Sequence, residues 1–197
     1  MPTALITAPE IAFPVDRLVT GEELLRHPEW GPCELIRGKV LRVCRPNNEH
    51  GILLGELNYH IGNFVRPRKL GILFCGDSGV YIERGPDTVR GPDLHFIRAE
   101  MAGTIDLKGY LETAPDLCVE IISPNDKWSD VEEKVKEFLG LGSKLVWIID
   151  PRTQDAHVRR ANGTRDLIPA TGVLTGEDVL PGFKLPLSEL FAAVKLK

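Results

Sequence analysis

The chain has 197 residues, which is enough for one domain with a sizeable core. Hydrophobic residues make up 43% and charged residues 26%, a globular composition that argues against a disordered chain. Its formal net charge of -4 gives no overall basic field, so nucleic-acid binding would require a local basic patch or a metal ion. The four cysteines show no Cys-X-X-Cys spacing, which argues against a zinc site or a disulfide framework.

Residues 1–18 contain several prolines and no clear periodicity, so we expect an extended arm followed by a single domain over residues 19–197. This start lacks the basic region and apolar core of a signal peptide. No apolar stretch approaches the roughly 20 residues that a membrane-spanning helix needs. We therefore expect a cytoplasmic protein with no membrane partner.

The first half of the chain predicts helices and strands in alternation. Thr20 and Glu23 form a capping-box pattern, which predicts a short helix that ends before Pro28. The next elements follow from residue periodicity and turn residues: a hairpin of residues 34–36 and 39–43, a helix from about 47 to 66, and strands at 72–75, 79–83 and 94–97. Two Gly-Pro-Asp triplets, at Gly85 and Gly91, predict a loop between the last two strands.

The second half predicts one strand–helix–strand crossover. We expect a surface loop over residues 99–113 and then, in order, a strand at 116–123, a helix at 129–141 capped by Ser129, a strand at 145–149, short strands at 155–160 and 165–168, and a small helix from Ser188. The crossover implies a parallel strand pair, whereas the hairpins imply antiparallel pairs. The predicted fold is therefore α/β (α+β), a mixed β-sheet flanked by helices.

The predicted strand at 116–123 carries a charge in its middle. Glu120 lies within an apolar run between Pro115 and Pro124, which is typical of a central strand buried on both faces. An ionised carboxylate in that position is costly unless a cation, a metal ion or several donors hold it. The partners of Glu120 therefore indicate the function.

Lys134 is the first predicted partner. On a helical wheel at ~100° per residue with Val131 at zero, Lys134 falls near ~300°, inside the apolar arc that contains Phe138. A lysine and a glutamate that both face the core can compensate each other's desolvation, so a structural ion pair without metal remains an alternative. Lys127, in the preceding loop, is the other candidate lysine.

Asp93 would add a second carboxylate at the start of another strand. Two carboxylates form an oxygen-rich site suited to Mg²⁺ or Mn²⁺, and a nearby lysine can orient an attacking water or stabilise charge on a phosphate. These are the groups of metal-dependent phosphodiester hydrolysis. Asp93 is also a common type of turn residue after Gly91-Pro92, and Glu34 could equally be a residue of an edge strand.

Several short motifs together resemble the Uma-type restriction endonuclease family of the PD-(D/E)XK nuclease superfamily. The order and spacing of the motifs, rather than any one of them, carry the resemblance, which covers about residues 18–193. The motifs are Glu34–Gly38, Pro92-Asp93, Val119–Pro124, Asp130 with Lys134, Trp147–Pro151, Leu180–Phe183 and Glu189–Phe191. The resemblance implies a mixed sheet flanked by helices and a homodimer.

The resemblance also implies roles for individual residues. Asp93 and Glu120 would be the metal ligands, and Glu34 matches the acidic residue upstream of them. His50 matches a frequent histidine at the start of the following helix, where it would contact the site or the substrate. Ile122 stands where the superfamily pattern has its lysine, and in this branch that lysine has moved to the following helix, at the position of Lys134.

The leading interpretation is a Mg²⁺-dependent DNA endonuclease. The first alternative is a non-catalytic nuclease fold used for nucleic-acid binding or dimeric assembly. A second alternative is a metal-dependent hydrolase of another phosphate ester, since the same carboxylates could serve it. Basic clusters such as 37–45 and 66–69 could contact phosphates, although solvated surfaces are the commoner explanation in an acidic chain.

Overall fold

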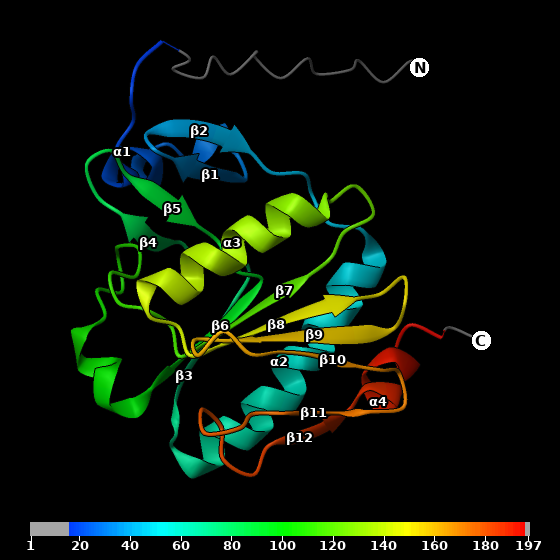
Figure 1. The fold of residues 1–197 in the computed structure, drawn as a ribbon. Helices are drawn as coiled ribbons and strands as arrows, with labels where there is room; N and C mark the ends of the chain where they lie inside the picture. The colour runs from blue at the N-terminus through cyan, green and yellow to red at the C-terminus, as the bar shows by residue number, and fades with distance from the viewer. Residues whose placement is uncertain (1–15, 196–197) are drawn as a thin grey trace, which may run out of the picture.

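The computed structural model describes residues 16–195. The predicted arm of residues 1–18 therefore lies outside the described residues except at its end. A six-stranded mixed sheet forms the centre, with strand order β10-β9-β8-β7-β6-β3 (Figure 1). Its strands are β3 (Gly71–Cys75), β6 (Leu94–Arg98), β7 (Leu117–Ile121), β8 (Leu145–Asp150), β9 (Asp155–Arg160) and β10 (Arg165–Ile168).

Only β7 and β8 pair in parallel within this sheet, and the other neighbours are antiparallel. The crossover between them is α3 (Trp128–Leu141), as the predicted strand–helix–strand unit requires. The predicted mixed sheet flanked by helices is thus confirmed.

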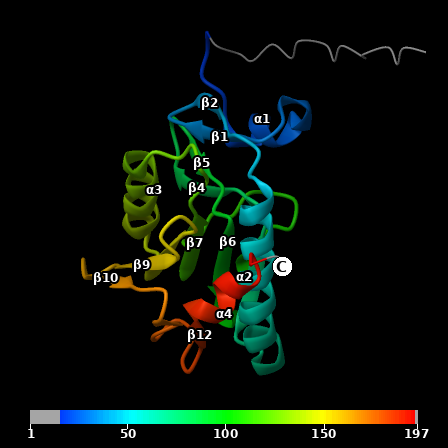
Figure 2. The same ribbon diagram turned by 90° about the vertical axis from the view of Figure 1, so that its right-hand side faces the viewer.

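Two helices cover opposite faces of the central sheet. Figure 2 shows α3 on one side of β6 and β7 and α2 (Asn48–Arg68) on the other. The alternation of side chains along β7 fits this arrangement, because Val119 packs in the cluster that contains the apolar stripe of α2, whereas Cys118 packs with Val131 and Phe138 of α3. Both faces of β7 are therefore buried, as its apolar sequence predicts.

A second, antiparallel sheet lies above the first in Figure 1, with strand order β2-β1-β5-β4. Its strands are β1 (Cys33–Ile36), β2 (Lys39–Arg42), β4 (Val80–Glu83) and β5 (Thr88–Arg90), and α1 (Gly21–Arg26) packs beside them. The backbone N–H of Glu23 donates to the Thr20 hydroxyl over 3.2 Å, which confirms the predicted helix cap.

The sequence prediction was wrong about β5, which lies in the segment expected to be a loop. Its three residues are all buried and pair with β4, and Val89 also pairs with Leu35 of β1. A run of three is too short for alternation to be recognised, and the flanking Gly-Pro-Asp triplets are strong turn signals. This correction matters because β5 ends at Arg90, beside the predicted site.

The start of α3 also differs from the prediction. The helix begins at Trp128, with Lys127 rather than Ser129 at the N-cap and no side-chain cap bond. Ser129 instead donates its hydroxyl hydrogen to Asp130 over 2.9 Å. The predicted cap was therefore placed two residues too far along the chain.

The remaining elements close the fold around this core. They are the 3₁₀ helices η1 (Pro28–Trp30) and η2 (Ala99–Thr104), the hairpin of β11 (Val173–Thr175) and β12 (Lys184–Pro186), and α4 (Leu187–Ala192). The β11–β12 hairpin was not predicted from the sequence. None of the helices within residues 16–195 has the length and hydropathy needed to cross a membrane.

Candidate active site

Asp93 and Glu120 meet at the end of the ladder between β6 and β7. The antiparallel register pairs Leu94 with Val119. Asp93, which directly precedes Leu94, therefore comes opposite Glu120, which directly follows Val119, and both side chains lie on the same face of the sheet. Each is only 8% exposed. The two carboxylates that the sequence predicts as metal ligands are therefore cross-strand neighbours.

Asp93 is held by hydrogen bonds to both of its oxygens. The Ile121 N–H donates to Oδ2 over 2.6 Å, and His50 Nε2 lies 3.0 Å from Oδ1. His50 comes from the first turn of α2, where its own N–H donates to the Asn47 side chain over 2.9 Å. Burial lowers the pKa of His50, but the hydrogen bond to Asp93 and the charge of Asp93 outweigh it, so the pKa is raised above its usual value.

Lys134 reaches Glu120 from α3, on the face that the helical wheel predicts. Its Nζ lies 3.4 Å from Glu120 Oε2 and 2.9 Å from Glu34 Oε1. Glu34 extends from β1 and is buried. The structure thus gathers all five sequence-predicted residues, from β1, α2, β7, α3 and the position just before β6.

The protonation of this cluster follows from burial and charge. Burial raises the pKa of Glu120 to about 8; Lys134 opposes this rise, whereas the carboxylates of Asp93 and Glu34 add to it. Burial also acts on Glu34, but Lys134 and Arg90 outweigh it and hold the pKa of Glu34 below its usual value. Of these two glutamates, Glu120 is therefore the one that keeps its proton to a higher pH.

Arg90 and Glu137 extend the cluster and were missed from the sequence. Arg90 Nη1 donates to Glu34 Oε2 over 2.8 Å, while its Nε and Nη2 donate to the two oxygens of Glu137 over 2.6 and 3.1 Å. Arg90 is buried although it carries a full charge. The signal available in the sequence was an arginine directly before Gly91-Pro92-Asp93, in a segment that we expected to be a loop.

Asp77 is a further acidic residue at the site that the sequence prediction omitted. It lies in the loop after β3 with a left-handed backbone (φ 59°), and its neighbour Gly76 donates an N–H to the Asp93 carbonyl over 3.0 Å. A Cβ at Gly91 would lie 2.8 Å from the Asp77 carbonyl oxygen, so the two loops are in close contact. Burial and the negative charge of Asp93 raise the pKa of Asp77.

The donor set fits a hard divalent cation held by few protein ligands. Within residues 16–195, no group of three or more His, Cys, Asp or Glu side chains gathers as a metal cage. The Asp93 and Glu120 pair suits Mg²⁺ instead, since this ion keeps several waters and uses one or two carboxylates. Glu120 Oε1 supports this fit, because it is buried and has no hydrogen-bond partner among the described residues.

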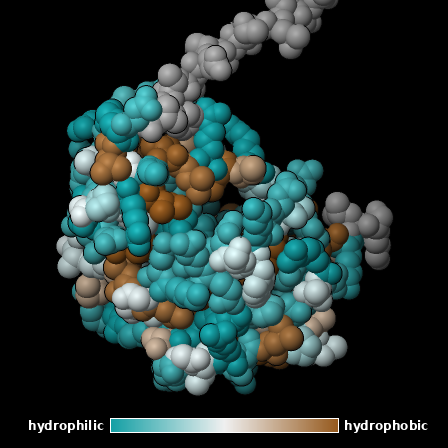
Figure 3. All heavy atoms as spheres, turned by 45° about the horizontal axis from the view of Figure 1, so that its top comes forward, coloured by the Kyte–Doolittle hydropathy of each residue, from teal (hydrophilic) through white to brown (hydrophobic). Residues whose placement is uncertain are grey.

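One face of the molecule is hollowed. Figure 3 brings the top of Figure 1 forward and shows a dark hollow with hydrophobic side chains grouped along one side. The second sheet and the first turns of α2 and α3 lie toward this end of the molecule. Two separate cavities of about 230 and 210 Å³ share Ile105, Tyr110 and Leu111 in their walls, and none of the five predicted residues lines either of them.

Comparisons with known proteins agree with the fold. A family model described as "Uma2: Putative restriction endonuclease" matches residues 22–188. The crystal structure of a putative nuclease belonging to DUF820 from Anabaena variabilis superposes with a TM-score of 0.77 at 22% identity, covering 89% of this chain and 99% of that chain. At this identity the likeness shows the fold. No curated protein matches the chain.

Proposed function

This chain belongs to the Uma2 family of putative restriction endonucleases, and from that premise we propose that it is a Mg²⁺-dependent endonuclease that hydrolyses phosphodiester bonds in DNA. The observation that carries the proposal is the buried Glu120, opposite Asp93 and 3.4 Å from the Lys134 ammonium. Two carboxylates and one lysine are the groups that metal-assisted phosphate chemistry requires.

Asp93 and Glu120 would hold the cation, which when bound supplies Lewis-acid stabilisation of a phosphate and a more acidic water. The Ile121 N–H and His50 fix the orientation of the Asp93 carboxylate. Glu120 must release its proton to become a ligand, since metal-ligating carboxylates are ionised. Because His50 is buried and its Nε2 lies against Asp93, it would act on the site through that carboxylate.

Lys134 would act as a charged donor in this reaction. Burial lowers its pKa, but the carboxylates of Glu120 and Glu34 outweigh that effect and raise the pKa above its usual value. The side chain therefore stays an ammonium at neutral pH. As such it can orient an attacking water or donate to a phosphate oxygen, and it is not suited to abstract a proton.

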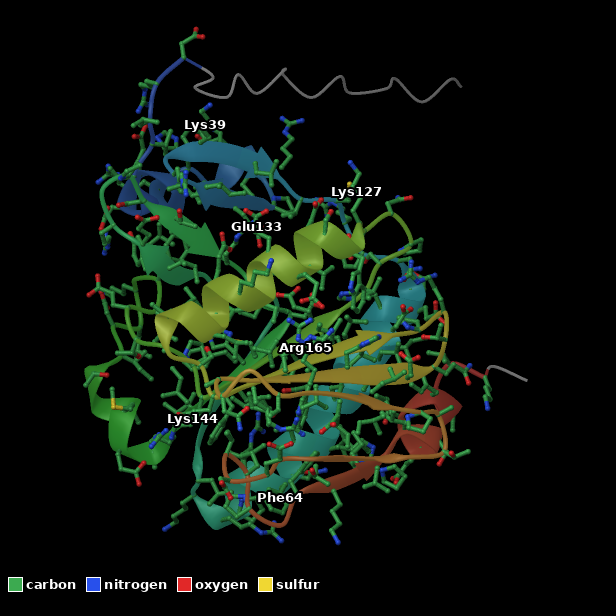
Figure 4. All side chains as sticks on the ribbon, in the orientation of Figure 1. Lys39, Phe64, Lys127, Glu133, Lys144 and Arg165 are labelled. Carbon is green, nitrogen blue, oxygen red and sulfur yellow. The ribbon has the colours of Figure 1, made fainter. Side chains whose placement is uncertain are left out.

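The test is metal-dependent cleavage of supercoiled and linear DNA by the purified protein. We expect cleavage with Mg²⁺ or Mn²⁺ and loss of at least about 100-fold in Glu120→Gln, Asp93→Asn and Lys134→Ala. Lys136→Ala and Glu133→Gln are the matched controls, because both residues are exposed on the solvent face of the same helix (Glu133 is labelled in Figure 4). Full activity in Glu120→Gln and Lys134→Ala would show that a contaminating nuclease cleaves the DNA.

DNA as the substrate and a homodimer as the working unit are part of the same proposal. The net charge is negative, so contact with DNA would depend on local cations. Lys39 of β2 and Lys127 before α3 are exposed toward the upper end of the molecule in Figure 4. A homodimer would allow both strands of a duplex to be cut, and a DNA substrate is consistent with action in the cytoplasm.

One observation favours a second candidate function, a non-catalytic nucleic-acid-binding or assembly module. Lys134 already lies against both Glu34 and Glu120, so each of these glutamates has a cationic partner without a metal ion. Calorimetric titration with Mg²⁺ and Mn²⁺ separates the two functions. Binding that is lost in Asp93→Asn supports the enzyme, whereas DNA binding without any cation binding supports the module.

A further inference from the structure

We infer that Arg90 and Glu137 form a positioning pair that holds Glu34 in place, so that Glu34 anchors the Lys134 ammonium beside Glu120. The catalytic consequence of this inference rests on the proposed function, whereas its structural part does not. Under this inference Glu34 serves the lysine and is not a metal ligand.

The hydrogen bonds to Glu137 fix the orientation of the Arg90 guanidinium group. Glu137 accepts two hydrogen bonds from one edge of the guanidinium, from Nε over 2.6 Å and from Nη2 over 3.1 Å. This bidentate grip uses the planar fork of arginine, which a lysine could not reproduce. Nη1 is left to donate to Glu34 Oε2 over 2.8 Å.

The Glu34 carboxylate therefore contacts two cationic side chains, Arg90 and Lys134. Its Oε2 accepts from Arg90, while its Oε1 lies 2.9 Å from Lys134 Nζ and 3.3 Å from the Gly91 nitrogen. Both carboxylate oxygens are engaged, and the side chain is only 5% exposed. Lys134 Nζ lies nearer to Glu34 than to Glu120, at 2.9 against 3.4 Å. The shorter distance is expected if Glu34 holds the Lys134 ammonium in place.

The chain of contacts begins and ends on α3. Glu137 and Lys134 are three residues apart on this helix, which places them on neighbouring turns of one side. The path from Glu137 through Arg90 and Glu34 to Lys134 therefore closes a ring between α3, β5 and β1. Such a ring restrains the rotamers of a long side chain that must reach a strand from a helix.

A buried ion-pair network could also serve stability alone, since removal of one partner leaves a charge uncompensated. The two roles differ in what happens to Lys134. A positioning pair controls the mobility of the lysine ammonium and the rate of the chemical step. A purely stabilising pair changes the free energy of unfolding and leaves the lysine in place.

The experiment uses the full chain with Glu137→Gln, which keeps the shape of the side chain, and Arg90→Lys, which keeps the charge but loses the fork. Arg84→Gln is the matched control, because Arg84 also bridges two glutamates, Glu22 and Glu112, but at an exposed position. Proton exchange of the Lys134 ammonium is measured by nuclear magnetic resonance in the metal-free protein, with Lys134→Ala to assign the signal. Cleavage rates and the Mg²⁺ concentration for half-maximal rate are measured in parallel.

We expect ammonium exchange at least about fivefold faster in Glu137→Gln and Arg90→Lys than in the unmodified protein or Arg84→Gln. The maximal cleavage rate should fall about 10- to 100-fold, while the Mg²⁺ requirement and KM change by less than about threefold. In a Lys134→Ala background neither substitution should reduce the rate further.

Unchanged ammonium exchange in Glu137→Gln and Arg90→Lys would overturn the inference, whatever the rates. Faster exchange in a protein that cleaves no DNA would support the positioning pair and contradict the proposed function. A further loss of rate in the Lys134→Ala background would show that the pair does not act through this lysine, and would also overturn the inference. Glu137→Gln keeps the test open if Arg90→Lys does not fold, since Glu137 is partly exposed.

Discussion

Glu120 shares its buried surroundings with more acidic groups than Lys134 can neutralise. Asp93 lies opposite it, and Glu34 contacts the same lysine. Arg90 compensates Glu34 from the other side, so the excess negative charge falls on the pair of Glu120 and Asp93. Proton uptake by Glu120 relieves that excess when the site holds no cation.

The substitution Glu120→Gln tests this protonation state through stability. Because the pKa of Glu120 is raised from its ordinary 4.5 to about 8, the folded protein keeps a proton that the unfolded chain releases. The contribution of Glu120 to the free energy of unfolding is therefore lost as the pH rises from about 4.5 to about 8. Relative to the unmodified protein, Glu120→Gln should become more stable across this window, by more than about 1 kcal/mol at its upper end.

The measurement is urea-induced unfolding in a chelating buffer at several pH values across the window. Glu133→Gln, at an exposed position on α3, is the control and should show a constant difference. A stability difference for Glu120→Gln that does not change with pH would mean that Glu120 is already ionised at neutral pH.

Cation binding should release the same proton. We expect the apparent affinity for Mg²⁺ to rise by up to about tenfold per pH unit below the raised pKa of Glu120, because the ligand must be ionised. Calorimetric titration in two buffers of different ionisation enthalpy measures the released proton directly. Equal heats in both buffers at neutral pH would contradict the expectation.

At the level of single residues, the sequence predicted the orientation of those side chains that follow a single helical or strand periodicity. Lys134 is such a case, because a wheel on α3 places it in the apolar arc. Glu137 falls on the polar arc of the same wheel, yet it binds the buried Arg90. A wheel assumes one buried side, whereas α3 packs against both β8 and β4, which belong to different sheets.

At the level of elements, the first turn of α3 is weakly capped. Lys127 has the extended backbone of an N-cap residue (φ -89°, ψ 131°), but its side chain makes no cap hydrogen bond. A lysine also places positive charge near the positive end of the helix dipole. The sequence prediction chose Ser129 because its residue type suits a cap, but cap geometry depends on the backbone, which residue type alone does not determine.

Lys127→Ser should therefore stabilise the protein. A hydroxyl at the N-cap can accept a hydrogen bond from an N–H of the first turn, which is worth about 0.5–1 kcal/mol, and removal of the charge adds a few tenths more. Lys127→Ala is the control that removes the charge without adding an acceptor. Thermal unfolding of the three proteins separates the two effects, and equal stability of the Ser and Ala variants would exclude a cap contribution.

The predicted elements with a clear period were found close to their expected bounds, and those without one were missed. The long helix α2 and the buried strands β7 and β8 belong to the first group. The three-residue strands β5, β11 and β12 belong to the second. Such strands form because they pair with strands that are distant in the sequence, so their own residues show little of the pattern from which a strand is predicted.

At the level of the whole molecule, the site lies where the two sheets meet. Glu34 and Arg90 come from one sheet, Asp93 and Glu120 from the other, and α3 contacts both. The sequence resemblance indicated most of these residues, but no local pattern could indicate that β1 and β5 pair with each other. That pairing is what brings Arg90 to Glu34.

The electrostatic field of this acidic molecule should oppose DNA binding in the absence of a cation. Removal of a negative charge from the site should therefore tighten binding to a duplex in a chelating buffer, by about fivefold for one charge near a phosphate. Burial raises the pKa of Glu120 to about 8, so this residue keeps its proton at neutral pH and adds no negative charge there.

We consequently expect Asp93→Asn to tighten metal-free DNA binding at neutral pH and Glu120→Gln to leave it nearly unchanged. Above the raised pKa of Glu120, about 8, the two substitutions should become similar in effect, because Glu120 is then ionised. Fluorescence anisotropy with a labelled duplex at fixed ionic strength measures both affinities, with Glu133→Gln as the control for a surface charge. Tighter binding by Glu120→Gln than by Asp93→Asn at neutral pH would contradict the raised pKa of Glu120.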